Sequence, residues 1–504
     1  MTAISRTTAP VLARLLATAA LAAVLPWPAA AHGTSSAPVR ASTSPVTAMS
    51  EKAEVKLGRE QHQRIVAEMG VYDDDALQAY VTELGRKLAM KSDRPKLEWT
   101  FTVVDTEDVN AFALPGGFIY ISRGILPYLN SEAELAAVLG HEIGHVTAFH
   151  GVKRQTRGTL ANLGAAAAAI LTGQQIVGDL ANVAGAAWVS GYGREQELEA
   201  DRIGAELLAR SGYDPEAMIR VVASLKAQES AEVRRAKAEG RRARVYHGVF
   251  ASHPDNDRRL REAVKAAGQV EGRATGQDQG REVYLRKVEG VAVGTSRAQG
   301  VVRGSRFYHA DMGITMAFPA GWNVENEKER LLAVAPDRNS VMQVSVGPIP
   351  PRAETPRKFL VAVTGGGAAL GNAQDMEING LPAFTAVLRG TQTPFGVRPS
   401  RVVIVQYNNQ YFRIDGASRG GVTVPEADRL ILSAAQTFRR LREAEFALAE
   451  PDRLKVVKAA PGTTLAGLAS ASPLKEYPEE TLRLYNGFYP SGEPAAGTLV
   501  KTVR

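Results

Sequence analysis

The sequence predicts a multidomain α+β protein with a mainly helical first domain that contains a short sheet, a small α+β sheet domain and a small C-terminal module. Three observations lead to this prediction. The chain has 504 residues, which is too long for one hydrophobic core. Apolar residues recur at spacings of three and four from Glu51 to about Arg261, as in amphipathic helices. Strand-like runs rich in β-branched and aromatic residues then dominate from about Phe307 to Arg442.

The composition excludes several classes of protein. Apolar residues make up 45% of the chain and charged residues 22%, which excludes a disordered or fibrous chain. The formal net charge of +7 is small and dispersed, so we expect no nucleic-acid partner. There are no cysteines, and therefore a metal site would need His, Asp or Glu ligands. The chain has only 8 histidines, so their positions largely decide where a metal site can lie.

The first residues have the pattern of a cleavable export signal over residues 1–31. Two arginines precede an apolar run at residues 15–25, and small residues follow at 29–31. We expect cleavage before His32 and location in the bacterial periplasm. A membrane anchor is the alternative, but the run is shorter than the roughly 20 apolar residues that a span needs, and no other segment of the mature chain reaches that length. Residues 32–50 are rich in Ser, Thr, Pro and Ala, a composition typical of a linker.

Three regions follow the linker. We expect the first domain at residues 51–290, with its short sheet between Trp99 and Ser122. A second, α+β domain is expected at residues 305–445. Its segment AFPAGW, residues 317–322, is similar to one in the PsbP/Mog-type fold. In its last pair of strands, Asn408-Asn409 predicts a hairpin turn.

The third region, residues 452–504, contains the segments PGTTLAGLA, LRLYNG and GTLVKTV. These segments resemble a degenerate LysM module. LysM modules bind glycan chains, so the resemblance implies peptidoglycan contact, with stacking of sugars on Tyr485, Phe488 and Tyr489. Docking onto the rest of the chain, or a purely structural role, is the alternative.

The clearest candidate for a catalytic motif lies in a predicted helix that begins with a capping box at Ser131. It contains His141-Glu142-Ile143-Gly144-His145. At about 100° per residue, the two histidines lie roughly 40° apart on one helix face, one turn apart in height. Two imidazoles so placed can hold one zinc ion. Glu142 lies near the metal but not on it, where its carboxylate can take a proton from activated water and pass it to the leaving amine.

A catalytic zinc site needs a third protein ligand and one open position. His150 stands nine residues after His141, which on a continuous helix is the opposite face, so we do not expect it to bind the metal. A later predicted helix carries Glu197 and Asp201 on one face, while Glu199 points away. We expect Glu197 to complete a site for one zinc ion per chain. Asp201 is then placed to accept the N–H of a ligating imidazole.

The segments HEIGHVTAFH and EQELEADRIG resemble the HtpX-like and CAAX-prenyl-protease-like zinc metallopeptidases, in particular their soluble periplasmic minigluzincin branch. The resemblance runs from about Leu57 to Leu260. It implies a gluzincin-type protease domain. In that domain His141, His145 and Glu197 would bind zinc, and Glu142 would be the general base. It also implies that residues 110–126 form an edge strand beside the active-site helix, where an extended substrate pairs through its main chain.

The same resemblance covers His253-Pro254 and Arg259, which are similar to a His-Pro…Arg segment that follows the second zinc helix. It implies that His253 either stabilises the tetrahedral oxyanion or takes the fourth zinc position and holds the enzyme latent. A surface or packing role is the alternative for His253. Like Asp201, Arg259 is expected to lie behind the ligands rather than on the metal.

The remaining features have plainer interpretations. His62 and His309 have no partners in the sequence pattern, and we expect them to be structural. The Ala- and Gly-rich residues 160–189 are expected to form buried helices over the active site, with a membrane-touching hairpin as the alternative. The basic residues 231–245 are expected to form a solvated helix face, with contact to anionic lipid or peptidoglycan as the alternative.

These observations predict a zinc metalloendopeptidase of the bacterial cell envelope that cleaves misfolded or surplus envelope proteins. The main alternative is a peptidoglycan-associated scaffold or chaperone-like protein with a largely latent zinc site. A third candidate is another zinc hydrolase, of the peptidoglycan amidase type.

Overall fold

The computed structural model describes residues 49–153, 192–240, 243, 261, 264–265, 267–268, 280–327, 330–364, 370–420 and 425–504. Four expectations fall wholly outside these residues, and they concern the export signal, the segment 160–189, His253 and Arg259. The linker expected at residues 32–50 falls outside them except for its last two residues. Part of the basic segment 231–245 also falls outside them.

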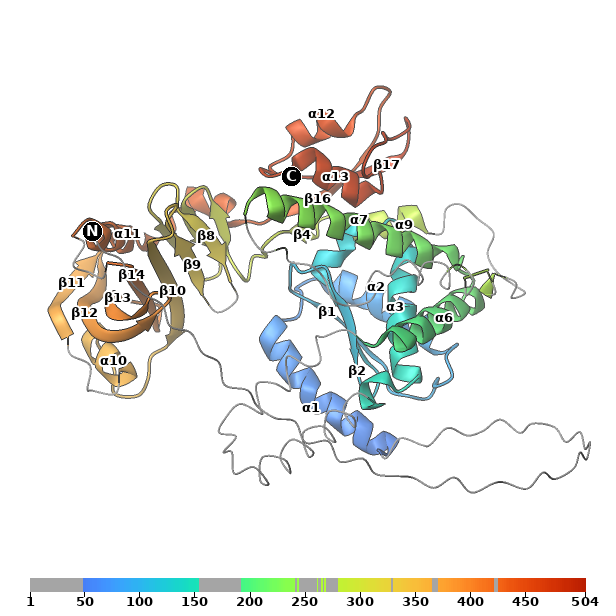
Figure 1. Ribbon diagram of the computed structural model, residues 1–504, viewed down its shortest axis with the longest axis horizontal. Helices are drawn as coiled ribbons and strands as arrows, with labels where there is room; N and C mark the ends of the chain where they lie inside the picture. Colours follow the sequence, from blue (N-terminus) through green and yellow to red (C-terminus); the bar gives the residue numbers. More distant parts are fainter. Residues whose placement is uncertain are drawn as a thin grey trace, which may run out of the picture. The chain divides into compact units, whose positions relative to one another are not determined.

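The first region begins with helices α1 and α2 and a three-stranded sheet (Figure 1). Helix α1 (Glu51–Met69) begins after Ser50, whose hydroxyl accepts the backbone N–H of Ala53. Helix α2 spans Asp75–Ala89, and Asp74 caps it in the same way. The strands are β1 (Thr100–Val104), β2 (Ala111–Leu114) and β3 (Phe118–Ser122), in the order β1-β3-β2. Strand β3 is parallel to β1 and antiparallel to β2, so the predicted short sheet is confirmed, and β2 is at the edge of the sheet among the described strands.

The helices that carry the predicted metal ligands follow this sheet. The elements are η1 (Arg123–Tyr128), α3 (Glu132–Thr147), α6 (Arg194–Arg210), α7 (Glu216–Ala238) and α9 (Arg281–Val288). Ser131 caps α3 by accepting the N–H of Glu134, as the capping box predicts, but the Glu134 carboxylate accepts the N–H of Asn130 rather than that of Ser131. Almost all of α3 is buried in the main hydrophobic core.

Helices α3 and α6 lie side by side because small residues face each other between them (Figure 1). A Cβ added at Gly144 would lie 2.9 Å from the carbonyl oxygen of Ala200. A Cβ added at Gly204 would lie 3.0 Å from the backbone nitrogen of His141. This close approach brings the acidic face of α6 against the histidines of α3.

The second region forms two antiparallel sheets. The larger has seven strands in the order β11-β12-β13-β14-β10-β9-β8, and the smaller has four in the order β15-β7-β6-β5. The strands are β5 (Val301–Arg303), β6 (Arg306–His309), β7 (Ile314–Ala317), β8 (Asn323–Asn326), β9 (Leu331–Val334), β10 (Ser340–Pro348), β11 (Leu370–Ile378), β12 (Leu381–Thr393), β13 (Gly396–Tyr407), β14 (Gln410–Ser418) and β15 (Arg439–Arg440). Helices α10 (Pro356–Val363) and α11 (Pro425–Gln436) complete the region. Asn408 and Asn409 join β13 to β14 with φ of 48° and 60°, which confirms the predicted hairpin turn.

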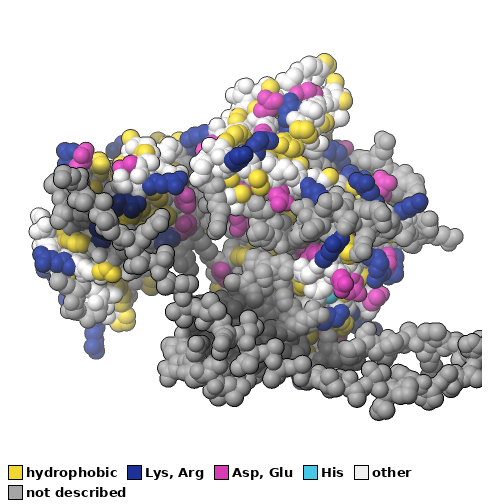
Figure 2. Space-filling model, viewed as in Figure 1, with side chains coloured by type: hydrophobic (Ala, Val, Ile, Leu, Met, Phe, Trp, Pro, Cys, Tyr) yellow, Lys and Arg dark blue, Asp and Glu magenta, His cyan; other side chains and the backbone are white. Residues whose placement is uncertain are grey.

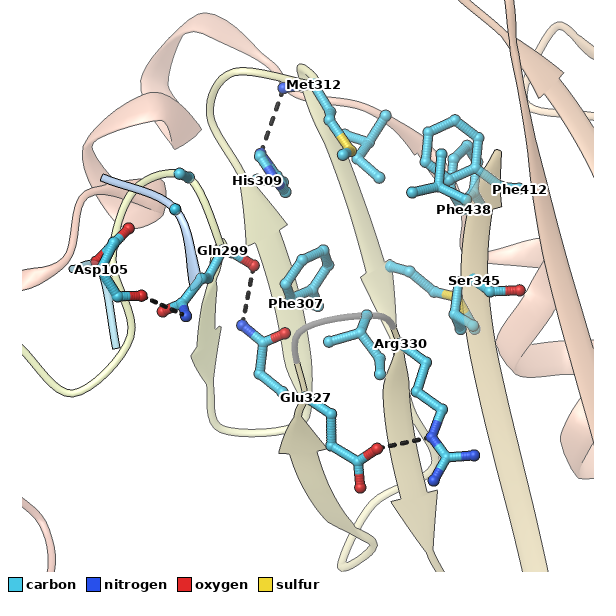
Figure 3. A pocket seen from close by; sticks show the side chains of 18 of the residues that line it. Asp105, Gln299, Phe307, His309, Met312, Glu327, Arg330, Ser345, Phe412 and Phe438 are labelled. Atoms are coloured by element: carbon cyan, nitrogen blue, oxygen red, sulfur yellow. Dashed lines mark hydrogen bonds and ion pairs between the residues drawn. The ribbon is translucent and has the colours of Figure 1, made fainter. Parts of the chain in front are cut away.

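An apolar cavity of about 270 Å³ opens between these sheets (Figure 3). Phe307, Phe412 and Phe438 line its interior. The charged pair formed by Glu327 and Arg330, with 2.7 Å between Oε2 and Nε, lies at its edge. Asp105, His309 and Glu327 also line it, but within the described residues they do not belong to a group of side chains close enough to hold a metal ion.

The C-terminal region folds as β16 (Asp452–Lys458), α12 (Leu465–Ser470), α13 (Pro478–Asn486) and β17 (Leu499–Val503). Strands β16 and β17 are antiparallel, and β16 also pairs with β4 (Ala292–Val293). Its apolar side chains belong to the same core as those of α3; they are Leu454, Leu465, Ala469, Leu482, Tyr485 and Val503. The buried Lys501 ammonium donates hydrogen bonds to the carbonyls of Pro127 and Leu129. The module is therefore anchored next to the start of α3.

This anchoring corrects two expectations. Tyr485 does not stack on sugars, because its ring is buried and packs edge-on against Tyr128, with 5.0 Å between ring centroids. The basic end of α7 is not wholly a solvated face either. Arg235 Nε lies 2.6 Å from Glu480 Oε1, and Arg234 contacts the same carboxylate.

The surface and the helices show two further features. On the face shown in Figure 2, basic and acidic side chains are interspersed, in keeping with the dispersed charge of the sequence. Within the described parts of the chain, no helix is both long and apolar enough to cross a membrane.

Candidate metal centre

The three side chains expected to be metal ligands meet in one buried cluster. His141 and His145 come from α3 and Glu197 from the first turn of α6, and their nearest ligand atoms all lie within 4.8 Å of one another. The two Nε2 atoms are 2.9 Å apart. Glu197 Oε2 lies 3.3 Å from Nε2 of His141 and 3.8 Å from Nε2 of His145. The geometry thus brings together all three predicted ligands.

The donor atoms of this cluster fit a zinc ion. The Glu197 Oε1 atom accepts the backbone N–H of Tyr192 at 3.2 Å, whereas its buried Oε2 has no hydrogen-bond partner in the described parts of the chain. A buried carboxylate oxygen without a partner is costly unless a cation compensates it. Two imidazole nitrogens and one carboxylate oxygen are a ligand set that catalytic zinc sites use.

Asp201 fixes the orientation of His141. Its Oδ1 lies 2.8 Å from Nδ1 of His141, so Nε2 of that ring is turned toward Glu197. Burial disfavours the charged imidazole, but the neighbouring carboxylates of Asp201 and Glu197 outweigh this effect and raise the pKa of His141 to about 10. The site therefore favours a positive charge at this position, which either a proton or a metal ion can supply.

Glu142 lies beside the cluster and does not belong to the ligand set. Its side chain is buried, and its Oε1 has no hydrogen-bond partner within the described residues. Burial, reinforced by the negative charge of Glu197 and opposed by His141, raises the pKa of Glu142 to about 8. A carboxyl group with a pKa near neutrality can both accept and return a proton at physiological pH.

The structure places His150 differently from the sequence prediction. Helix α3 ends at Thr147 instead of continuing to His150, and Phe149 has a left-handed φ of 58°. This break turns His150 back toward the site, where its Nδ1 lies 2.9 Å from Nδ1 of His145. As expected, His150 is not part of the ligand cluster.

Two further neighbours of the cluster were not predicted. Glu199 Oε2 lies 3.0 Å from Nε2 of His150, and burial, opposed by this carboxylate, lowers the pKa of His150. The ring of Tyr192 stacks on His145, with 3.9 Å between centroids and 19° between the planes. Neither contact has a signal in the sequence, since both depend on the break after Thr147 or on residues just before α6.

His62 and His309, which were expected to have structural roles, lie away from the cluster. Nδ1 of His62 lies 2.7 Å from the hydroxyl of Tyr120, and His309 is buried in strand β6 of the second region. His253 and Arg259 lie outside the described residues, so their roles stay predictions.

A His-Glu-x-x-His helix joined by an acidic ligand from a later helix defines the gluzincin class of metallopeptidases. Residues 75–267 match the family model described as Peptidase family M48, and this part of the chain is a domain of that family. The predicted family resemblance is thereby confirmed.

Three curated proteins are similar to part of the chain. A beta-barrel assembly-enhancing protease of Yersinia pestis is 28% identical over 47% of this chain and 48% of its own length. A putative beta-barrel assembly-enhancing protease of Vibrio cholerae is 35% identical over 29% of this chain and 32% of its own length. The mitochondrial metalloendopeptidase OMA1 of Arabidopsis thaliana is 37% identical over 29% of both chains. The chain thus spans between about a third and a half of these relatives.

Among solved structures, cyanobacterial PsbP from Synechocystis is 19% identical, with a TM-score of 0.22, over 28% of this chain and 95% of its own. A Mog1 mutant is 12% identical, with a TM-score of 0.20, over 27% of this chain and 94% of its own.

Proposed function

We propose that the protein is a zinc-dependent metalloendopeptidase of the bacterial cell envelope. The observation that carries the proposal is the buried cluster of His141, His145 and Glu197 beside Glu142, whose buried Oε1 has no hydrogen-bond partner among the described residues. The family match over residues 75–267 and the relatives named as proteases or metalloendopeptidases support it.

Each side chain in and beside the cluster would have a separate role in peptide hydrolysis. When bound, zinc supplies a Lewis acid that polarises the scissile carbonyl and acidifies water. His141, His145 and Glu197 would hold the ion, and Asp201 would keep His141 in the tautomer that presents Nε2. Glu142 would take a proton from the attacking water and deliver it to the nitrogen of the leaving amine, a transfer that its raised pKa favours.

The fold also supports a preference for unfolded substrates. Strand β2 is the edge of its sheet and packs against α3, so an extended peptide that pairs with β2 would lie beside the metal cluster. Main-chain pairing selects extended segments without reading their sequence. Together with the export-type N-terminus, this favours misfolded or surplus envelope proteins as substrates and the periplasm as location.

Two narrower expectations remain part of the proposal. His253 would act on the oxyanion or as an inhibitory fourth ligand. In an otherwise active enzyme, His253→Ala lowers the cleavage rate in the first case and raises it in the second. Contact with peptidoglycan through residues 452–504 would have to use surface residues other than Tyr485, since that ring is in the core.

Cleavage of an unfolded protein such as reduced casein tests the proposal. We expect the wild type with one zinc ion to cleave it, and Glu142→Gln to keep the zinc but lose at least about 100-fold in rate, because general-base catalysis contributes about 10²–10⁴-fold. An active Glu142→Gln variant would refute the assigned role. Zinc-loaded wild type that cleaves no unfolded protein would favour the scaffold alternative.

A further inference from the structure

We infer that His150 and Glu199 form a hydrogen-bonded relay that positions the metal ligand His145. The inference rests on the proposed zinc site and goes beyond it, because it assigns a role to two residues outside the ligand set. The relay runs from Nδ1 of His145 to Nδ1 of His150 at 2.9 Å, and from Nε2 of His150 to Oε2 of Glu199 at 3.0 Å.

The protons of this relay have a single consistent arrangement. Nε2 of His145 faces His141 and Glu197, so a metal would take its lone pair there and the ring proton would lie on Nδ1. That N–H can donate only to a bare Nδ1 of His150, which places the proton of His150 on Nε2. The acceptor for this second N–H is the carboxylate of Glu199, whose side chain is partly exposed to solvent.

The relay gives the two histidine ligands different support. His141 donates directly to the carboxylate of Asp201, at 2.8 Å. For His145, the neutral imidazole of His150 lies between the ring and the carboxylate of Glu199. Partners of this kind hold the tautomer and the ring orientation of a metal ligand, and their loss typically weakens metal affinity by about 10–100-fold. Both imidazoles of the relay are buried, so water does not replace a missing partner easily.

The backbone turn at Phe149 places His150 next to His145, and contacts with Arg94 stabilise this turn. The left-handed turn at Phe149 would cost energy on its own, and Arg94 stabilises it from two sides. The Arg94 guanidinium lies 4.5 Å from the centroid of the Phe149 ring and donates to the carbonyl of Val146 at 3.3 Å. Arg94 is itself fixed by the buried carboxylate of Glu54, with 2.9 Å between Nη2 and Oε2.

Zinc dissociation constants, measured by competition with a chromogenic chelator on the purified full chain, test the relay without using activity. We expect His150→Leu, which removes the acceptor, to bind zinc about 10–100-fold more weakly. His150→Asn should stay within about 3-fold of wild type, since an asparagine oxygen can occupy the place of Nδ1 and accept the same N–H. His309→Leu, which removes another buried histidine far along the chain, is the matched control and should leave the constant unchanged.

A second variant and a spectrum separate positioning from loss of folding. Glu199→Gln alters a partly exposed side chain, keeps an oxygen acceptor, and should weaken binding by only about 2–5-fold. Cobalt-substituted His150→Leu should show shifted visible bands, and His150→Asn should restore them. The relay is wrong if His150→Leu binds zinc as tightly as wild type, or if His150→Asn is as weak as His150→Leu. A wild type that binds no zinc would instead refute the proposed function.

Discussion

Gly144→Ala adds a single methyl group, and we expect it to disturb the metal centre by pushing α6 away from α3. A Cβ at this position would lie 2.9 Å from the carbonyl oxygen of Ala200 and 3.0 Å from its Cα, both backbone atoms of α6. Carbon atoms in contact prefer about 3.5–4.0 Å, so α6 would have to move away by about 0.5 Å or more. Because α6 carries Glu197 and Asp201, that movement separates the acidic ligand from the histidines of α3.

Gly140 provides a matched control one turn earlier on the same face. A Cβ there would lie 3.4 Å from the carbonyl oxygen of Gly204 and 3.5 Å from its Cα, an ordinary contact. Both Gly→Ala changes gain about 1 kcal/mol of helix propensity. Only Gly144→Ala also suffers overpacking, at about 1–3 kcal/mol. The difference in unfolding free energy between the two variants therefore isolates the cost of overpacking.

Denaturant unfolding and zinc affinity are the two assays for this pair. Gly144→Ala should be about 1–3 kcal/mol less stable than Gly140→Ala. It should also bind zinc at least about 10-fold more weakly, whereas Gly140→Ala should match the wild type. Equal stability and equal zinc affinity in the two variants would refute the reasoning that close packing of α3 on α6 builds the site.

Three other predictions follow from buried groups. Deletion of residues 452–504 should prevent cooperative unfolding of the remaining chain, measured by circular dichroism, because five large core side chains at roughly 1.5–3 kcal/mol each are lost. A truncated chain with an unchanged transition would contradict this. Arg94→Met should cost about 3–5 kcal/mol in unfolding free energy, since it leaves the buried carboxylate of Glu54 unpaired, and a loss under 1 kcal/mol would show that the pair is unimportant. The raised pKa of Glu142 favours the folded, metal-free chain below about pH 4.5, and this contribution is lost as the pH rises through about 8. Glu142→Gln should therefore stabilise the metal-free protein by on the order of 5 kcal/mol at pH 9 and by little at pH 4, and a pH-independent difference would show that Glu142 titrates normally.

The sequence predicted those parts of the site that depend on regular helices. His141 and His145 share a face because of the helical period, and the same period pairs Glu197 with Asp201 on α6. The short sheet and the turn at Asn408-Asn409 were likewise evident from local patterns. In each case the interaction that decides the structure lies within a few residues of the motif.

The sequence did not reveal features that depend on tertiary contacts. Nothing at Ala148 or Phe149 marks the end of α3, because the turn is held by Arg94 from a distant segment. A continuous helix would send His150 to the opposite face, so its contact with His145 stayed hidden. The burial of Tyr485 depends on packing against Tyr128, about 350 residues earlier in the chain, and local composition carries no sign of it.

The zinc content of the purified chain, compared between wild type and Glu197→Gln by atomic emission after dialysis, tests the central claim most directly. Glu197 contributes the only ligand of the described cluster that comes from outside α3, so its loss should open the site. The structure predicts one zinc ion per chain in the wild type and much less than one in the variant. A wild type without zinc, or a variant that retains a full equivalent, would contradict the assignment of His141, His145 and Glu197 as the metal site.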